Sequence, residues 1–245
     1  MANMKDNTNI IASAIIGASL VIGLFIFSSA YRSSRQTNQQ INVTGSAKLA
    51  IKSDLGILGV SIGSYGATQS ASYKALEAQK PALMAYLASQ GFTKEMVEFQ
   101  TVSNFPNFVL NDQGYSTGII QGYSYSQRVI IQSNDVKKIQ ELSLSLPTLV
   151  EQGISVQIEP PQYQYTKLSD IKVQVQAEAA KDAMMRAKKI AEATGSTLGS
   201  IREARMGVLQ ITPKNSTEIS DYGMNDVSAI EKDITAVVNA SFDLE

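Results

Sequence analysis

Hydrophobic and polar residues alternate along residues 41–51, which read INVTGSAKLAI. The odd-numbered positions are apolar or glycine, and polar residues lie between them except at Ala50. This two-residue period is typical of a strand with one buried face. After Ser53-Asp54 the chain continues as LGILGVSIGSYG, a second strand-like segment. We therefore expect an antiparallel hairpin that founds a sheet, with its turn at Ser53-Asp54.

The glycines of this segment raise a second interpretation. Thr44-Gly45-Ser46 resembles the start of a loop that cradles phosphate. Such a loop needs a strand, a glycine turn and then the N-terminus of a helix. Because strand-like sequence follows Thr44-Gly45-Ser46 instead, the segment is interpreted as scaffold.

Three segments have the three- and four-residue spacing of helices. The first spans 69–90 and contains Pro81, which should kink or divide it. The second spans 135–152, contains Pro147 and is followed by a glycine. The third ends at Gly195, and its small side chains predict close packing on a sheet or another helix. Its expected buried stripe consists of Val173, Ala177, Ala180, Met184, Ala187 and Ala191.

Further strands complete an α+β fold with an antiparallel sheet and packed alanine-rich helices. They are expected at 96–103, 118–132, 154–165, 198–211 and 233–245. Pro160-Pro161 should keep the third of these out of a central ladder beyond that point. The polar segment 212–232 is interpreted as a solvated loop. Calcium ligation is its alternative, although the spacing of an EF-hand is absent.

The N-terminal region carries a long uncharged segment. Residues 10–30 read IIASAIIGASLVIGLFIFSSA, and at about 1.5 Å per residue they match a bilayer core of roughly 30 Å. The sequence therefore predicts a transmembrane signal-anchor helix at 10–31, after a tail at 1–9 and before a linker at 32–40. The candidate anchor residues are Ile10, Ile16, Leu20, Ile22, Leu24, Phe25, Phe27 and Tyr31.

Two alternatives to an anchor stay open. The small residues Ser28-Ser29-Ala30 suit the cleavage site of a secreted signal peptide, and an apolar segment also suits a buried core helix. The charges that flank the segment give only a weak indication of its orientation in the membrane. Lys5 precedes the segment while Arg32 and Arg35 follow it, so the positive-inside rule weakly places the domain in the cytoplasm.

Composition excludes several classes of function. The chain has no His and no Cys, which removes Ser-His-Asp and Cys-His catalysis and imidazole or thiolate metal sites. A formal net charge of -1 argues against nucleic-acid binding. No cofactor, metal or catalytic residue is therefore expected, and the chain is interpreted as non-enzymatic. A hydrolase that uses carboxylates is the remaining enzymatic alternative; Glu178 and Asp182 are four residues apart, but nearby basic residues indicate surface ion pairs.

Aromatic residues gather between the strands at 96–103 and 118–132. A hairpin with a mobile tip explains them, and the alternative is a contact surface for a peptide or lipid in region 105–125. The candidate contact residues are Phe105, Phe108, Tyr115, Tyr123 and Tyr125.

Taken in order, several motifs resemble the SIMPL domain family, bacterial periplasmic and outer-membrane-associated proteins also called oxidative-stress-defence or periplasmic immunogenic proteins. They are Val43-Thr44-Gly45 with Asp54, Gly122-Tyr123, and the stretch AEAAKDAMMRAKKIAEATGSTLGSI at 177–201. The resemblance covers residues 41–245, which we take as the domain.

The resemblance implies an α+β fold and assembly into large ring-like or channel-like homo-oligomers. It implies no enzymatic activity, and a role in envelope maintenance or stress defence. It also favours export, with a single pass in the cytoplasmic membrane and the C-terminal domain in the periplasm or outside. A cleaved, secreted form is the alternative. The expected partners are further copies of the chain and the lipid bilayer.

Overall fold

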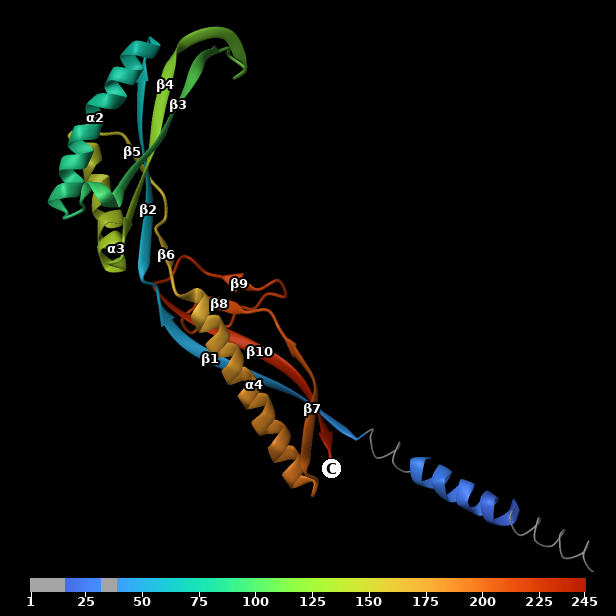
Figure 1. Ribbon diagram of the computed structural model, residues 1–245. Helices are drawn as coiled ribbons and strands as arrows, with labels where there is room; N and C mark the ends of the chain where they lie inside the picture. Colours follow the sequence, from blue (N-terminus) through green and yellow to red (C-terminus); the bar gives the residue numbers. More distant parts are fainter. Residues whose placement is uncertain (1–15, 32–38) are drawn as a thin grey trace, which may run out of the picture. The chain divides into compact units, whose positions relative to one another are not determined.

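A computed structural model describes residues 16–31 and 39–245 of the chain. The described chain divides into two compact units (Figure 1). The first contains the described residues of Met1–Ala47 together with Gln176–Gly207 and Ala236–Glu245. The second contains Lys48–Val175 and Val208–Thr235. The fold is α+β with mostly antiparallel strands, as the sequence predicts.

The second unit contains a five-stranded antiparallel sheet around strand β2 (Leu55–Gly66). Strand β4 (Ser116–Ser133) pairs with one side of β2 and continues to β3 (Val97–Leu110). Two strands of three residues each, β5 (Val156–Ile158) and β6 (Gln162–Gln164), share the other side of β2. Pro160-Pro161 lie between these two edge strands, since proline cannot donate to a ladder.

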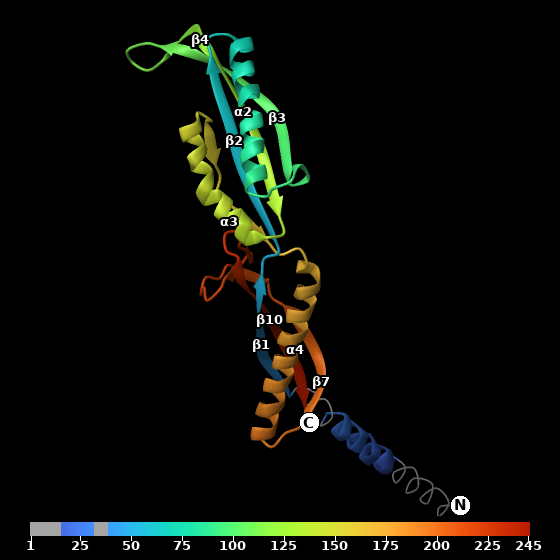
Figure 2. The same cartoon turned by 90° about the vertical axis from the view of Figure 1, so that its left-hand side faces the viewer.

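Helices cover one face of this sheet (Figure 2). They are α2 (Gln69–Ser89), the 3₁₀ turn η1 (Lys94–Met96), α3 (Val136–Ser145) and the 3₁₀ segment η2 (Leu146–Gln152). Helix α2 runs undivided through Pro81, whereas the second expected helix changes to 3₁₀ geometry where Pro147 enters. The core between helices and sheet is apolar and fully buried. Its largest members include Leu58, Val60, Ile62, Leu76, Leu83, Leu87, Ile131, Ile139 and Leu142.

A second sheet is built around strand β10 (Glu231–Leu244). Strand β1 (Gln40–Lys52) pairs with β10 and forms an edge of this sheet. On the other side, the two halves of β10 pair with β8 (Gln210–Pro213) and with β7 (Leu198–Met206). Strand β9 (Met224–Asn225) adds to β8 in parallel.

The prediction that residues 41–63 form a hairpin is wrong, because its two strands do not pair with each other. Both strands form, but β1 belongs to the β10 sheet and β2 to the β4 sheet. A two-residue hairpin turn needs left-handed backbone angles, and neither Ser53 nor Asp54 has a positive φ. Instead the Ser53 and Asp54 amides donate to Ile230 and Gln164, and the Asp54 carboxylate accepts hydrogen bonds from Thr166.

Helix α4 (Leu168–Ala193) buries the last two residues of the expected stripe, Ala187 and Ala191, but not the four before them. Val173 and Met184 are 68% and 50% exposed. The buried residues step strictly by four and are Val175, Ala179, Ala183, Ala187 and Ala191. Gly45 of β1 explains this register, because a Cβ there would lie 2.3 Å from both the Ala179 carbonyl oxygen and the Ala183 nitrogen. The helix backbone therefore rests directly on the strand.

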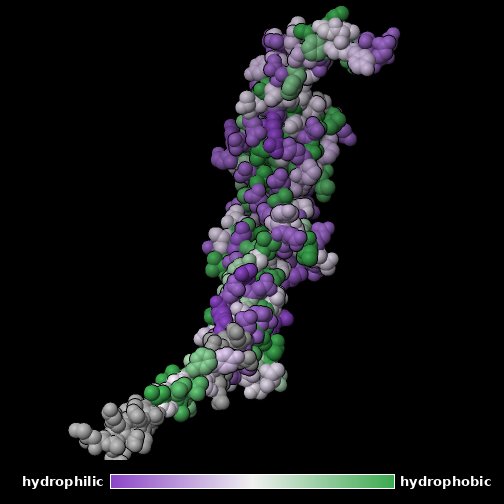
Figure 3. All heavy atoms as spheres, turned by 90° about the vertical axis from the view of Figure 1, so that its right-hand side faces the viewer, coloured by the Kyte–Doolittle hydropathy of each residue, from purple (hydrophilic) through white to green (hydrophobic). Residues whose placement is uncertain are grey.

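The predicted anchor is described only in part. Residues 16–31 are helical, and hydrophobic residues gather on their surface (Figure 3). Across the described residues, no helix combines the length and the apolar character needed to cross a membrane. Residues 10–15 of the predicted segment lie outside the described residues, as do the tail at 1–9 and residues 32–38 of the linker. The anchor therefore stays a prediction.

The Gly45 contact gives a stability prediction. We expect Gly45→Ala to lower the free energy of unfolding by about 2–3 kcal/mol, because the helix backbone must move to admit a methyl group. Gly63→Ala is the matched control, since a Cβ on this strand residue would meet only ordinary contacts at 3.8 Å and beyond. Urea denaturation followed by circular dichroism measures both. Equal midpoints for the two variants would contradict the close packing.

Candidate functional site

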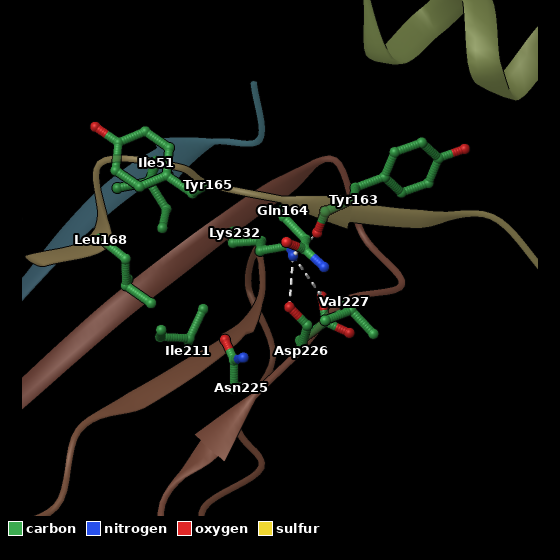
Figure 4. Close-up of a pocket in the computed structure, with 10 residues that line it drawn as sticks. All are labelled: Ile51, Tyr163, Gln164, Tyr165, Leu168, Ile211, Asn225, Asp226, Val227 and Lys232. Carbon is green, nitrogen blue, oxygen red and sulfur yellow. Dashed lines mark hydrogen bonds and ion pairs between the residues drawn. The ribbon is translucent and has the colours of Figure 1, made fainter. Parts of the chain in front are cut away.

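The second unit holds a pocket of about 150 Å³ between β6, β9, β10 and the segment that follows β9 (Figure 4). Aromatic, amide and acidic residues line it, and Lys232 reaches into it from the start of β10. Lys232 is 2% exposed, which is rare for a lysine and makes this pocket the first candidate site.

Three oxygen atoms surround the ammonium group of Lys232. Its Nζ atom donates to the backbone carbonyl of Tyr163 at 2.6 Å and to that of Asp226 at 2.5 Å. The Asp226 carboxylate lies 3.8 Å away and forms an ion pair with it. A lysine ammonium has three donors, so two of them are hydrogen-bonded to backbone oxygens and the remaining charge is balanced by the carboxylate.

The two charges shift each other's pKa. Burial lowers the pKa of Lys232, and the nearby Asp226 carboxylate opposes that shift without cancelling it. Burial alone would raise the pKa of Asp226. Hydrogen bonds from Ser228 and Ala229, together with the Lys232 charge, outweigh burial and hold that pKa below its usual value.

This arrangement favours a structural role for the pair. A nucleophilic amine or a general base needs a free lone pair near a substrate, whereas Lys232 is held by backbone oxygens. Asp226 is occupied as well, because its carboxylate accepts from the Ser228 amide, the Ser228 hydroxyl and the Ala229 amide. Sequence reasoning missed Lys232. The available signal was its phase, since Lys232 shares the inward alternation of Ile234, Ala236 and Val238.

The carboxylates singled out from the sequence form ion pairs on α4. Glu178 pairs with Lys181, and Asp182 pairs with Arg186. Asp182 also accepts a hydrogen bond from the Ser46 amide of β1 at 2.8 Å. That amide, followed by Arg186, lowers the pKa of Asp182. Asp182 therefore joins helix to strand beside the Gly45 contact.

The five candidate aromatic residues lie on the β3–β4 hairpin but do not share one face. Phe105 and Phe108 are three residues apart on β3, so alternation directs them to opposite faces. Tyr115 is highly exposed in the turn between the strands, where Asn111 accepts from the Gln113 and Tyr115 amides. Tyr123 and Tyr125 are half-buried on β4. The ring of Tyr125 packs edge-on against Tyr73 of α2, with centroids 5.8 Å apart.

The far end of this hairpin is apolar and uncovered. We call Phe108, Leu110, Ile119 and Ile120 the apolar tip; they are 39%, 61%, 64% and 48% exposed. Phe108 lies directly opposite Ile120, which places both side chains on one face. The hairpin projects past the N-terminal end of α2, so the helix that covers the sheet elsewhere does not reach the tip (Figure 2). Sequence reasoning identified Phe108 but not Leu110, Ile119 or Ile120.

Comparison with known proteins identifies the family. A family model described as SIMPL, protein of unknown function (DUF541), matches residues 41–242. The match covers most of the chain, and the chain belongs to the SIMPL family. Membership in this family indicates an extracytoplasmic domain.

Other comparisons add little. No curated protein matches the chain. One solved structure that the chain resembles is a putative aminohydrolase from methicillin-resistant Staphylococcus aureus, with 10% identity and a TM-score of 0.23. The likeness covers 53% of this chain and 33% of the aminohydrolase chain.

The Lys232 site gives a second stability prediction. We expect Lys232→Met to cost about 3–5 kcal/mol of unfolding free energy, because it leaves buried oxygens and the Asp226 charge without their partner. Lys214→Met is the control, since Lys214 lies half-exposed in an ion pair with Glu231. Because the folded pKa of Lys232 is lowered, wild-type stability gains from this group as pH rises towards 10.5. The difference from Lys232→Met should widen over that range in urea denaturation, and a constant difference would contradict the shift.

Proposed function

We propose that this protein is a non-enzymatic, membrane-anchored component of the bacterial cell envelope that self-assembles into a ring-like or channel-like homo-oligomer. Its role would be envelope maintenance or stress defence. Membership in the SIMPL family supports an extracytoplasmic location and gives the proposal its cellular setting.

The apolar tip carries the assembly part of this proposal. Four large apolar side chains are exposed near the end of one hairpin, and Phe108 and Ile120 lie opposite each other across its two strands. Soluble chains usually expose such residues singly. Contiguous exposed apolar surface marks interaction sites, because burying it releases about 25 cal/mol per Å². A second copy of the chain is the partner always present at the same place and concentration.

The apolar N-terminal segment supports anchoring. Residues 10–31 carry no charge, and the described part at 16–31 exposes its large side chains all along the helix. A bilayer would cover them. Tethering copies to one membrane raises their local concentration, so weak contacts between subunits suffice for assembly. Family membership outweighs the small charge bias around the segment and favours the domain outside the cytoplasm.

The state of the buried charges supports a non-enzymatic role. In the part of the chain that the structure describes, Lys232 and Asp226 are the pair most like a catalytic one, and each is occupied by backbone or hydroxyl partners. A carboxylate hydrolase would need a free acid and base in a cleft.

The mass of the extracted particle tests assembly. We expect the full chain in detergent to give multi-subunit particles by light scattering and negative-stain imaging. Phe108→Ser combined with Ile120→Ser should raise the concentration needed for assembly at least about tenfold, because hot-spot truncations have effects of this size. Leu144→Ser, an exposed apolar residue on α3, should leave assembly unchanged. A chain that begins at Arg32 shows whether the domain assembles without the anchor. If the full wild-type chain is monomeric at every concentration, the proposal is wrong.

A second candidate function is capture of a peptide or lipid by region 105–125. Phe105 and Tyr115 favour it, since they are 60% and 71% exposed and Phe105 lies on the face of β3 opposite Phe108. Under this alternative, Phe105→Ser with Tyr115→Ser abolishes vesicle flotation of a chain beginning at Arg32 while its assembly is unaffected. Flotation that persists in this variant, or is absent in the wild type, speaks against lipid capture.

A further inference from the structure

We infer that the apolar tip of one copy docks into a groove between β1 and α4 of a second copy. The inference rests on the self-assembly proposed above and adds the two surfaces that would meet. Each chain carries one tip and one groove, so every copy can act as donor and acceptor at the same time.

The groove lies in the first unit and has a volume of about 570 Å³. Asn42, Val43 and Thr44 of β1 form one side, with Val43 buried at its base. On α4, Met185 and Ile190 are 60% and 47% exposed and form the apolar part of the other side. This apolar lining is left open to solvent in the single chain.

The strand side of the groove offers backbone as well as side chains. Strand β1 ends its sheet, and among the described residues it pairs only with β10. Every second peptide group of an edge strand points away from its neighbour and can bond another strand. In β1 the Ser46 amide is already bonded to Asp182, so the groups at residues 42–44 are the ones offered beside the groove. An incoming hairpin strand can add to such an edge while its apolar side chains enter the adjacent groove.

The charges of the two surfaces favour the hairpin tip as the occupant of the groove over an uncharged segment. The segment 104–124, which holds the tip, has a single charged residue, Asp112, exposed in the turn. The groove has a basic rim formed by Arg186 and Lys189. Lys189 is the better placed of the two, because its side chain is 83% exposed and its own partner Glu192 lies 3.7 Å away, whereas Arg186 is held at 2.7 Å by Asp182. An acidic, apolar tip therefore complements a basic, apolar groove.

Both surfaces carry solvent-exposed apolar side chains. The contact is then between different patches of two copies. Such heterologous contacts close into a ring when the rotation between copies permits, and otherwise continue as an open row. A closed ring of such contacts agrees with the ring-like assembly proposed for the chain.

Disulfide formation between marked copies tests the contact. The chain has no cysteine, so Leu110→Cys in one tagged copy and Met185→Cys in a differently tagged copy introduce the only thiols. After co-expression of the full chains and mild oxidation in detergent, we expect a disulfide between the two tags. A disulfide needs Cβ atoms about 3.5–4.5 Å apart and so reports a specific contact. Leu144→Cys replaces Leu110→Cys in the control and should give at least about fivefold less product.

Charge reversal provides an independent test in the same particles. Asp112→Lys or Lys189→Glu should each raise the concentration needed for assembly about two- to fivefold, the effect of one exposed ion pair. The two changes combined should restore wild-type assembly, which damage to either surface alone would not do. Raising the salt concentration should shrink both single effects.

The outcomes separate this inference from the function on which it rests. Particles of full mass without the marked disulfide, or without rescue by the double reversal, overturn the docking and leave self-assembly standing. Monomers in the wild type overturn both. A disulfide that forms equally with the Leu144→Cys control also overturns the docking, because it shows collision and not a fixed contact.

Discussion

The buried ammonium group of Lys232 joins the start of β10 to the segment just before it and to β6, which lies 69 residues away, and the second unit depends on that junction. Its donors reach the carbonyl of Tyr163 on β6 and the carbonyl and carboxylate of Asp226. The ring of Tyr163 belongs to the core under α2 and α3, so the same residue serves the core and the junction. Removing a charge from water is costly, and this cost is offset only when every donor has a partner. Ser53 and Asp54 strengthen the junction by donating to Ile230 and Gln164 beside it.

Periodicity predicted which segments are strands and helices, but not how they pair. Residues 41–51 and 55–66 are strands as expected, because alternation depends only on local sequence. Their partners lie more than 50 residues away. Nothing in the sequence of Ser53-Asp54 indicates that two long-range hydrogen bonds replace the turn. The stripe of α4 failed for a similar reason. Many alanines suit several faces equally, and Gly45, in another element, selects the one that is buried.

The sequence predicted which region holds the candidate surface, but not which of its side chains share a face. The aromatic residues at 105–125 indicated the position of the hairpin. Which side chains share a face depends on the register shifts near Phe108. A single extra residue reverses the alternation on one strand, and such shifts leave no clear trace in sequence. Gly118, with φ of 77°, lies within the shifted stretch. The exposure of Ile119 and Ile120 depends on where α2 begins relative to the hairpin, which the sequence of the hairpin does not contain.

The distribution of proline and charge along the sheet edges limits how the chain can aggregate. Pro160-Pro161 break one edge of the β2 sheet into two strands of three residues, and Pro106 removes a backbone donor from the opposite edge strand β3. Strand β7 carries Arg202, Glu203 and Arg205 and bulges against β10. These are features that keep exposed strands from templating fibrils. Strand β1 has no proline and no charge at residues 42–44. Among the described edge strands, this stretch of β1 therefore lacks these protections, and strand addition from another chain would meet the least opposition there.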